Sequence, residues 1–178
     1  MKQIMTTMTW LVPVLAVAAV CSASPLVGQD ADEQEGNQAA LAKAVMGARV
    51  SLERGLAASA SHGRPISAKF EIEDGKLQLS VYTAKGGKFS EVIVDHTTGN
   101  VAKAESITEG EDLSAATEQN AAMAQAKLSL RAAVEQAVRG NAGFHAVSVT
   151  PSLKDGRAVA DVTLVKGEEL KTVSVPLQ

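Results

Sequence analysis

The chain has 178 residues, a formal net charge of −3 and one cysteine. Although 46% of the residues are hydrophobic, only 3% are aromatic, so any core must be built largely from small aliphatic side chains. The 17 basic residues are scattered among 20 acidic ones without a basic run, which argues against a nucleic-acid binder because phosphate contacts need a basic patch.

Residues 1–23 have the pattern of a secretory signal peptide. Lys2 precedes an apolar run at residues 10–20, and small residues follow that run. The run of about 11 residues is too short for a membrane-spanning helix, which needs about 20. We therefore predict an exported protein, periplasmic or secreted, with no membrane span in the mature chain. The alternative is an uncleaved apolar N-terminus.

Cys21 stands at the predicted cleavage boundary, where two outcomes are open. Cleavage after Ala23 removes it and leaves a mature chain with no thiol, which excludes disulfides, thiolate metal sites and a cysteine nucleophile. Cleavage before Cys21 would leave it for lipid anchoring, but Val20 is larger than the residue usual at that place. We favour the first outcome and keep lipid anchoring as the alternative.

Residues 24–43 are interpreted as an acidic spacer and the start of a helix. From Gln38 apolar residues recur at three- and four-residue steps, which predicts helix. Within this pattern Ser51 is expected to cap a fresh helix, because its hydroxyl can accept a hydrogen bond from an exposed backbone N–H. The sequence "SHGRP" at 61–65 predicts the end of the helix.

Three strands are expected next, because apolar and polar residues alternate within 66–73, 77–82 and 89–94. Asp74-Gly75 and Gly86-Gly87 supply the turns between them, so the strands should be antiparallel neighbours. Gly86-Gly87 is interpreted as a hairpin turn and not as a dinucleotide-binding motif. The sequence "DHTTGN" at 95–100 closes this group.

The pattern then recurs after an acidic stretch, residues 105–121, that we interpret as a linker. Residues 126–143 align with 48–65 and place Ser129 at the position of Ser51, and Asp155-Gly156 aligns with Asp74-Gly75. We predict an α+β fold of two tandem repeats, each a helix packed on a small antiparallel three-stranded sheet. The units are residues 44–104 and 122–178, the second truncated at Pro176, where proline removes a ladder donor.

Residues 44–104 resemble a PepSY domain, and residues 122–178 resemble it more weakly because the closing motif is missing. The family pattern is a Ser-Leu-capped helix, three strands separated by glycine-containing turns, and a closing Asp-x-x-Thr-Gly, here residues 95–99. The resemblance implies a small α+β unit found in exported and envelope-associated bacterial proteins, including propeptides of thermolysin-like metalloproteases. It also implies a peptidase-inhibiting or peptidase-regulating role and brings no catalytic residues.

The three histidines do not predict a metal site. His62, His96 and His145 lie at or near predicted turns and strand starts, and no two have metal-ligand spacing such as i, i+4. They also do not occupy matching positions in the two repeats. We interpret them as exposed loop residues.

The clustered carboxylates are interpreted as solvated. Glu71, Glu73 and Asp74 fall on the polar side of a strand and its turn, and a second group lies between residues 30 and 35. Neither group follows the calcium-loop pattern. A general acid–base pair would need a pocket, which the sequence does not reveal.

Ser51 and Ser129 recur in both repeats, and helix capping accounts for them without nucleophilic chemistry. Neither a G-x-S-x-G motif nor a phosphate-binding loop occurs in the chain. We therefore predict no catalytic, cofactor-binding or metal-binding residues and no enzyme activity. A small hydrolase is the least supported alternative.

The function that we expect is that of a non-enzymatic exported binding or regulatory module. It would act on another exported protein, and a peptidase inhibited by occlusion of its cleft is the partner we suspect. An exposed strand edge or hairpin could occupy such a cleft by strand addition. The alternative is a structural or interaction protein of the cell envelope that has no peptidase partner.

Overall fold

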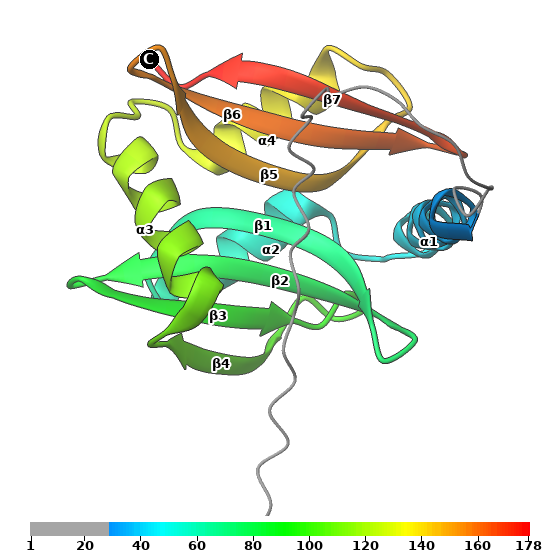
Figure 1. Cartoon of the computed structure of the whole chain (residues 1–178), viewed down its shortest axis with the longest axis horizontal. Coiled ribbons are helices and arrows are strands. Elements are labelled where there is room, and N and C mark those ends of the chain that lie inside the picture. Colours follow the sequence, from blue (N-terminus) through cyan, green and yellow to red (C-terminus); the bar gives the residue numbers. More distant parts are fainter. Residues whose placement is uncertain (1–28) are drawn as a thin grey trace, which may run out of the picture.

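The computed structural model describes residues 29–178, so the predicted signal peptide and Cys21 lie outside the described residues. The described chain is mixed helix and strand (Figure 1). Its elements, in chain order, are α1 (Gln29–Met46), α2 (Leu52–Ala58), the 3-10 helix η1 (Ser59–Ser61), β1 (Arg64–Glu73), β2 (Lys76–Lys85), β3 (Lys88–Val94), β4 (Val101–Ile107), α3 (Gly110–Ala124), α4 (Leu130–Arg139), β5 (His145–Lys154), β6 (Arg157–Lys166) and β7 (Glu169–Pro176).

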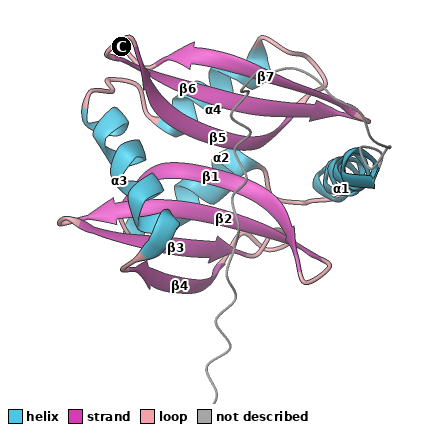
Figure 2. Cartoon of the chain, viewed as in Figure 1, coloured by secondary structure: helices cyan, strands magenta, loops and turns pink. Residues whose placement is uncertain are grey.

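All seven strands belong to one antiparallel sheet, in the order β4-β3-β2-β1-β5-β6-β7. The prediction of two tandem repeats, each a helix on its own three-stranded sheet, is therefore wrong. The described fold is one seven-stranded sheet with four α-helices. The strands of the first half and those of the second half lie side by side within this sheet (Figure 2).

The two halves meet where β1 pairs with β5. Ala68 lies opposite Val149, and Lys69 lies opposite Ser148, in an antiparallel register. A separate small sheet would leave its first strand as an edge, with a row of unpaired backbone N–H and C=O groups. Pairing β1 with β5 supplies partners to both strands at once, which accounts for the single sheet.

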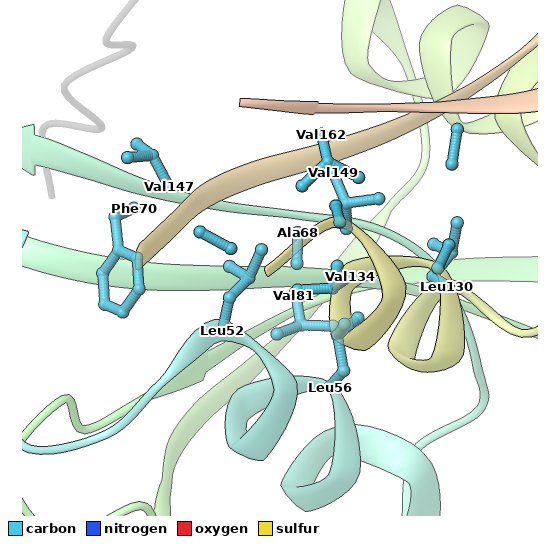
Figure 3. Packing of buried hydrophobic residues seen from close by; sticks show 14 of the residues in the cluster. Leu52, Leu56, Ala68, Phe70, Val81, Leu130, Val134, Val147, Val149 and Val162 are labelled. Atoms are coloured by element: carbon cyan, nitrogen blue, oxygen red, sulfur yellow. The ribbon is translucent and has the colours of Figure 1, made fainter. Parts of the chain in front are cut away.

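The apolar face of the sheet is covered by α2 and α4, which also contact each other. The packing is close, because a Cβ atom on Gly55 of α2 would lie 2.6 Å from Cδ2 of Leu79 on β2. Side chains from both helices and both halves of the sheet share one buried cluster (Figure 3), which includes Leu52, Leu56, Ala68, Val81, Leu130, Val134, Val149 and Val162. One core therefore spans the joint between the halves.

Serine hydroxyls cap the two helices on this face, as predicted. The Oγ atom of Ser51 accepts a hydrogen bond from the Arg54 backbone N–H at 3.4 Å, and that of Ser129 accepts one from Ala132 at 3.2 Å. Each bond satisfies one of the backbone donors that a helix leaves free at its N-terminus. The same device thus starts both helices of the core.

The turns of the two halves have matching backbone conformations. Asp74 and Asp155 both have φ of 50°, and each is followed by a glycine with positive φ in a tight hairpin turn. Such conformations favour glycine, and aspartate is among the few other residues that tolerate them. The two Asp-Gly pairs therefore set equivalent hairpins in the two halves, β1–β2 and β5–β6.

The segment interpreted as a linker, residues 105–121, contains the end of β4 and most of α3. Helix α3 crosses the other face of the sheet, in front of the strands in Figure 1. It contacts strands of both halves and buries Ala116, Ala122 and Met123. The acidic side chains of α3, which are Glu111, Asp112 and Glu118, are exposed.

Helix α1 starts at Gln29, inside the segment interpreted mainly as spacer. Ala42 and Val45 of α1 are buried against the sheet, and the helix contacts strands of both halves. None of the helices in residues 29–178 combines the length and the apolar character that a membrane crossing requires.

Candidate functional site

The three histidines occupy three different parts of the described fold. His62 follows η1, His96 lies in the turn after β3, and His145 opens β5. Residues 29–178 contain no group of three or more His, Cys, Asp or Glu side chains placed to hold a metal ion.

The Asp95–Asn100 turn serves to fix the chain between β3 and β4. One carboxylate oxygen of Asp95, Oδ1, accepts hydrogen bonds from the backbone N–H groups of Thr97 and Thr98 at 2.8 and 2.7 Å. These bonds hold the pKa of Asp95 below its usual range. The His96 carbonyl accepts hydrogen bonds from the backbone N–H groups of Arg49 and Val50, both at 3.0 Å, so the turn also anchors the entry to α2.

A broad open hollow of about 1000 Å³ lies between α1 and this turn. Its lining carries both signs of charge, with Lys43 of α1 and Lys76 of β2 as well as Glu73 and Asp95. The Nδ1 atom of His96, which also lines the hollow, is buried and has no hydrogen-bond partner among the described residues. This hollow is a place where a polar ligand could fit, but no arrangement of groups in it specifies one.

Two of the three clustered carboxylates belong to a hydrogen-bonded network on the polar face of the sheet. The Lys69 ammonium lies 2.6 Å from Oε2 of Glu71, and the Ser80 hydroxyl donates to Oε1 of Glu71 at 2.8 Å. The Gln78 amide donates to both Ser80 and Glu73 at 3.0 Å. The lysine and Glu71 side chains are 17% and 18% exposed, so the prediction that these carboxylates are simply solvated is wrong for Glu71.

Tyr82 and Glu91 extend this network to the neighbouring strands β2 and β3, where they lie directly opposite each other. Burial raises the pKa of Glu91, and Glu71 adds to the rise. Burial likewise raises the pKa of the Tyr82 phenol, with Glu91 and Glu71 adding to it. Both groups are therefore held toward their neutral forms, as in a site that handles protons, although buried structural networks also produce such shifts.

Helix α3 closes over the network and leaves a cavity of about 100 Å³, whose lining includes Lys69, Tyr82 and Asp112. The C-terminal half of α3 is fastened by hydrogen bonds to the strand β1. The Arg64 guanidinium donates to Oδ1 of Asn120 at 2.8 Å and to the Met123 carbonyl at 3.0 Å. The cavity is small compared with known ligand pockets of about 300–1,000 Å³. We therefore interpret the network as support for α3 and not as a substrate site.

The sheet has two edges in the described chain, β4 and β7, and they differ in how open they are. Strand β7 has half-buried side chains at Leu170, Lys171 and Val173, and Leu177 after it continues the pairing with β6 by donating to the Ala158 carbonyl. The Leu177 carbonyl accepts hydrogen bonds from the backbone N–H groups of Lys127 and Leu128. Strand β4 pairs only with β3 among the described strands, and residues 102–106 are all exposed. Figure 1 shows β4 at the margin of the sheet, uncovered by any helix of the described chain. Strand β4 is thus the more accessible edge.

Strand addition requires such an edge, because its unpaired backbone groups can hydrogen-bond to an extended segment of another chain. Strand β4 departs from the sequence prediction, in which residues 101–104 follow a closing motif and residues 105–107 belong to a linker. The alternation of Lys103 and Glu105 with small residues was the signal that could have indicated a strand.

No protein-family model matches the chain. A search of curated proteins also gives no match. A solved structure of a "putative lipoprotein" from Clostridium difficile 630 aligns with 67% of this chain and 79% of that chain, at 13% sequence identity and a TM-score of 0.38. This likeness is too weak to carry an argument about fold or function.

Proposed function

We propose that the mature protein is an exported, non-enzymatic binding module that holds a partner protein by strand addition along β4. The observation that carries this proposal is the open edge of β4, which pairs on one side only within the described chain and exposes residues 102–106. An extended partner segment would gain main-chain hydrogen bonds along this edge, and its side chains would be selected by those of β4.

The partner that we propose is an exported peptidase, a choice that rests on the resemblance of residues 44–104 to PepSY domains. A peptidase cleft binds substrates in an extended conformation, so the same geometry that favours strand addition would place β4 across the cleft. Occlusion of the cleft would then inhibit the peptidase without any catalytic group on this chain.

The test is an affinity capture with the mature chain, residues 24–178, from the secreted and envelope fraction of its source, followed by an inhibition assay on any peptidase retained. Lys103→Pro and Ala104→Pro should be tested singly, because adjacent strand residues alternate in the direction of their N–H groups. A proline at one of these two positions therefore removes a backbone N–H that points away from β3. It leaves the hydrogen bonds between β4 and β3 intact. Thr172→Pro and Val173→Pro on β7 are the matched controls.

We expect a peptidase to be retained and slowed at stoichiometric levels, and one of the β4 variants to lose this effect while the β7 variants keep it. A far-ultraviolet circular dichroism spectrum checks that each variant is folded. Enrichment of envelope components without any peptidase would instead favour a structural or interaction protein of the envelope. Equal loss in β4 and β7 variants would contradict the assignment of the site to β4.

A further inference from the structure

Strand β4 has a pattern of side chains that is complementary to itself. Its residues run Val-Ala-Lys-Ala-Glu-Ser-Ile from 101 to 107, so opposite charges flank Ala104 on either side. Small residues flank the charges, and an aliphatic residue stands at each end. The pairing of β4 with β3 shifts register between residues 101 and 103, so the regular part of the strand is the part around Ala104. Read from its two sides toward Ala104, this part pairs positive with negative.

From this pattern we propose that β4 pairs with β4 of a second copy, antiparallel about a two-fold axis through Ala104, to form a symmetric dimer with a continuous sheet. In that register Lys103 lies opposite Glu105 of the second copy, and the same pair forms again across the axis. Side chains directly opposite in an antiparallel pair have Cβ atoms about 4.5–5.5 Å apart, close enough for these charges to attract.

The two charges project from the same face of the sheet, which is the condition for this arrangement. On β3 the partners of Lys103 and Glu105 are Ile93 and Glu91, which alternate with the buried core residue Val92 opposite Ala104. The small side chain of Ala104 therefore lies on the other face and allows two copies to approach at the axis.

The same charges exclude neighbouring registers. An axis through residue 103 would place two lysines opposite each other, and an axis through residue 105 would place two glutamates opposite each other. Charged residues on an edge strand normally discourage uncontrolled pairing. Here their symmetric placement disfavours the adjacent registers and favours the one centred on Ala104.

The ion pair that Lys103 and Glu105 form within one β4 strand does not prevent the pairing of two copies. Lys103 Nζ lies 2.8 Å from Oε1 of Glu105 in the same strand, and the two side chains are 59% and 56% exposed. Such an exposed pair contributes little to stability, so each charge can be shared with the second copy at small cost.

The dimer goes beyond the proposed function, since it needs no partner other than this chain. It also implies a regulation, because a second copy and a partner segment would compete for the same backbone groups of β4. At a low concentration of this protein the β4 edge would be free to bind the partner segment. At a high concentration the second copy would cover the edge.

The first test uses cysteine substitutions in the mature chain, residues 24–178, which has no other thiol. At the proposed axis Ala104→Cys places two cysteines directly opposite each other, within the Cα separation of about 4.4–6.8 Å that a disulfide needs. The matched control Ala102→Cys lies opposite residue 106 of the second copy, which leaves the two cysteines roughly 13 Å apart along the strand. Under mild oxidation A104C should become a covalent dimer much faster than A102C.

The second test uses sedimentation equilibrium of charge variants, with Glu169→Lys on β7 as the control. Lys103→Glu and Glu105→Lys should each weaken the dimer at least about tenfold, because like charges then oppose each other twice. A mixture of the two variants should form a heterodimer, and the double swap K103E/E105K should restore the homodimer. A wild-type chain that stays monomeric, equal cross-linking of A104C and A102C, or variants that sediment like the wild type would overturn the proposal.

Discussion

Ala68 on β1 lies directly opposite Val149 on β5, and this pair joins the two halves of the sheet. Both side chains are buried, at 1% and 0% exposure, within the cluster that α2 and α4 cover. Because the joint belongs to the core, we expect the two halves to unfold together.

Val149→Ala tests this expectation. Removal of two methyl groups from a fully buried site should lower the free energy of unfolding by about 2 kcal/mol, through lost burial and the cavity that remains. Urea unfolding should show a single transition shifted as a whole. Two transitions, with only one affected by the substitution, would show that the halves are independent units.

Gly55→Ala tests how closely α2 approaches the sheet. In an exposed helix this change would stabilise by up to about 1 kcal/mol. Here the new Cβ would lie 2.6 Å from Cδ2 and 3.1 Å from Cγ of Leu79, a side chain with no exposed surface. We expect a net loss of about 1–2 kcal/mol from overpacking.

The matched control is Gly140→Ala at the end of α4, where the nearest atom to the new Cβ would be the Gln136 carbonyl oxygen at 3.6 Å. Gly140 has an ordinary helical φ of −76°, so alanine fits without backbone strain. Thermal unfolding should show G140A equal to or above the wild type. If G55A were equally well tolerated, the close packing of α2 on β2 would be incorrect.

Arg64→Ala tests the attachment of α3. The substitution removes both guanidinium hydrogen bonds to the C-terminal part of the helix, at Asn120 and Met123. Amide hydrogen exchange in residues 110–124 should become faster by about tenfold or more, since two charge-assisted bonds are lost. Arg131→Ala is the control, because that exposed side chain forms an ion pair with Glu135 on its own helix. Unchanged exchange in R64A would mean that the other contacts of α3, which include the hydrogen bond from the Ser67 hydroxyl to Gln119 at 2.7 Å, hold the helix without Arg64.

Glu91→Gln tests the buried network by its pH dependence. Burial raises the pKa of Glu91 above its ordinary 4.5, so the folded protein keeps this proton to higher pH than the unfolded chain does. The free energy of unfolding should therefore fall as pH rises from 4.5 through the raised pKa. A neutral glutamine removes this fall.

Relative to the wild type, E91Q should thus be more stable at about pH 7 than at about pH 4.5, as measured by urea unfolding at both pH values. Glu118→Gln on the exposed side of α3 is the control, measured in the same way at the two pH values. A relative stability of E91Q that is independent of pH would show that Glu91 is ionised equally easily in the folded and unfolded chain.

The sequence predicts the individual strands and turns better than it predicts how the two halves of the sheet join. Asp74-Gly75 and Asp155-Gly156 set the hairpin turns because few other residues adopt positive φ, and alternation located β1, β2 and β3. The pairing of Ala68 with Val149 has no comparable sequence signal, since any small buried residues could occupy these two positions. A strand that will become central therefore resembles one that stays at an edge.

The acidic residues 105–121 were interpreted as a linker for a related reason. Helix α3 has many exposed polar residues and needs only a few buried contacts, such as Ala116 and Met123, so its sequence resembles a solvated linker. The sequence predicts an exposed Glu71 because the strand pattern does not show that a helix covers that face. The open edge at β4 could be located only after the strand order was known.

The measurement that tests the proposed function most directly is amide hydrogen exchange of the mature chain with and without its captured partner. Strand addition predicts slower exchange for backbone amides within residues 101–107 in the complex, because outward N–H groups of β4 gain partners. Residues 169–176 of β7 should exchange as in the free protein. Slower exchange in β7 or α3, with residues 101–107 unchanged, would contradict binding at the β4 edge.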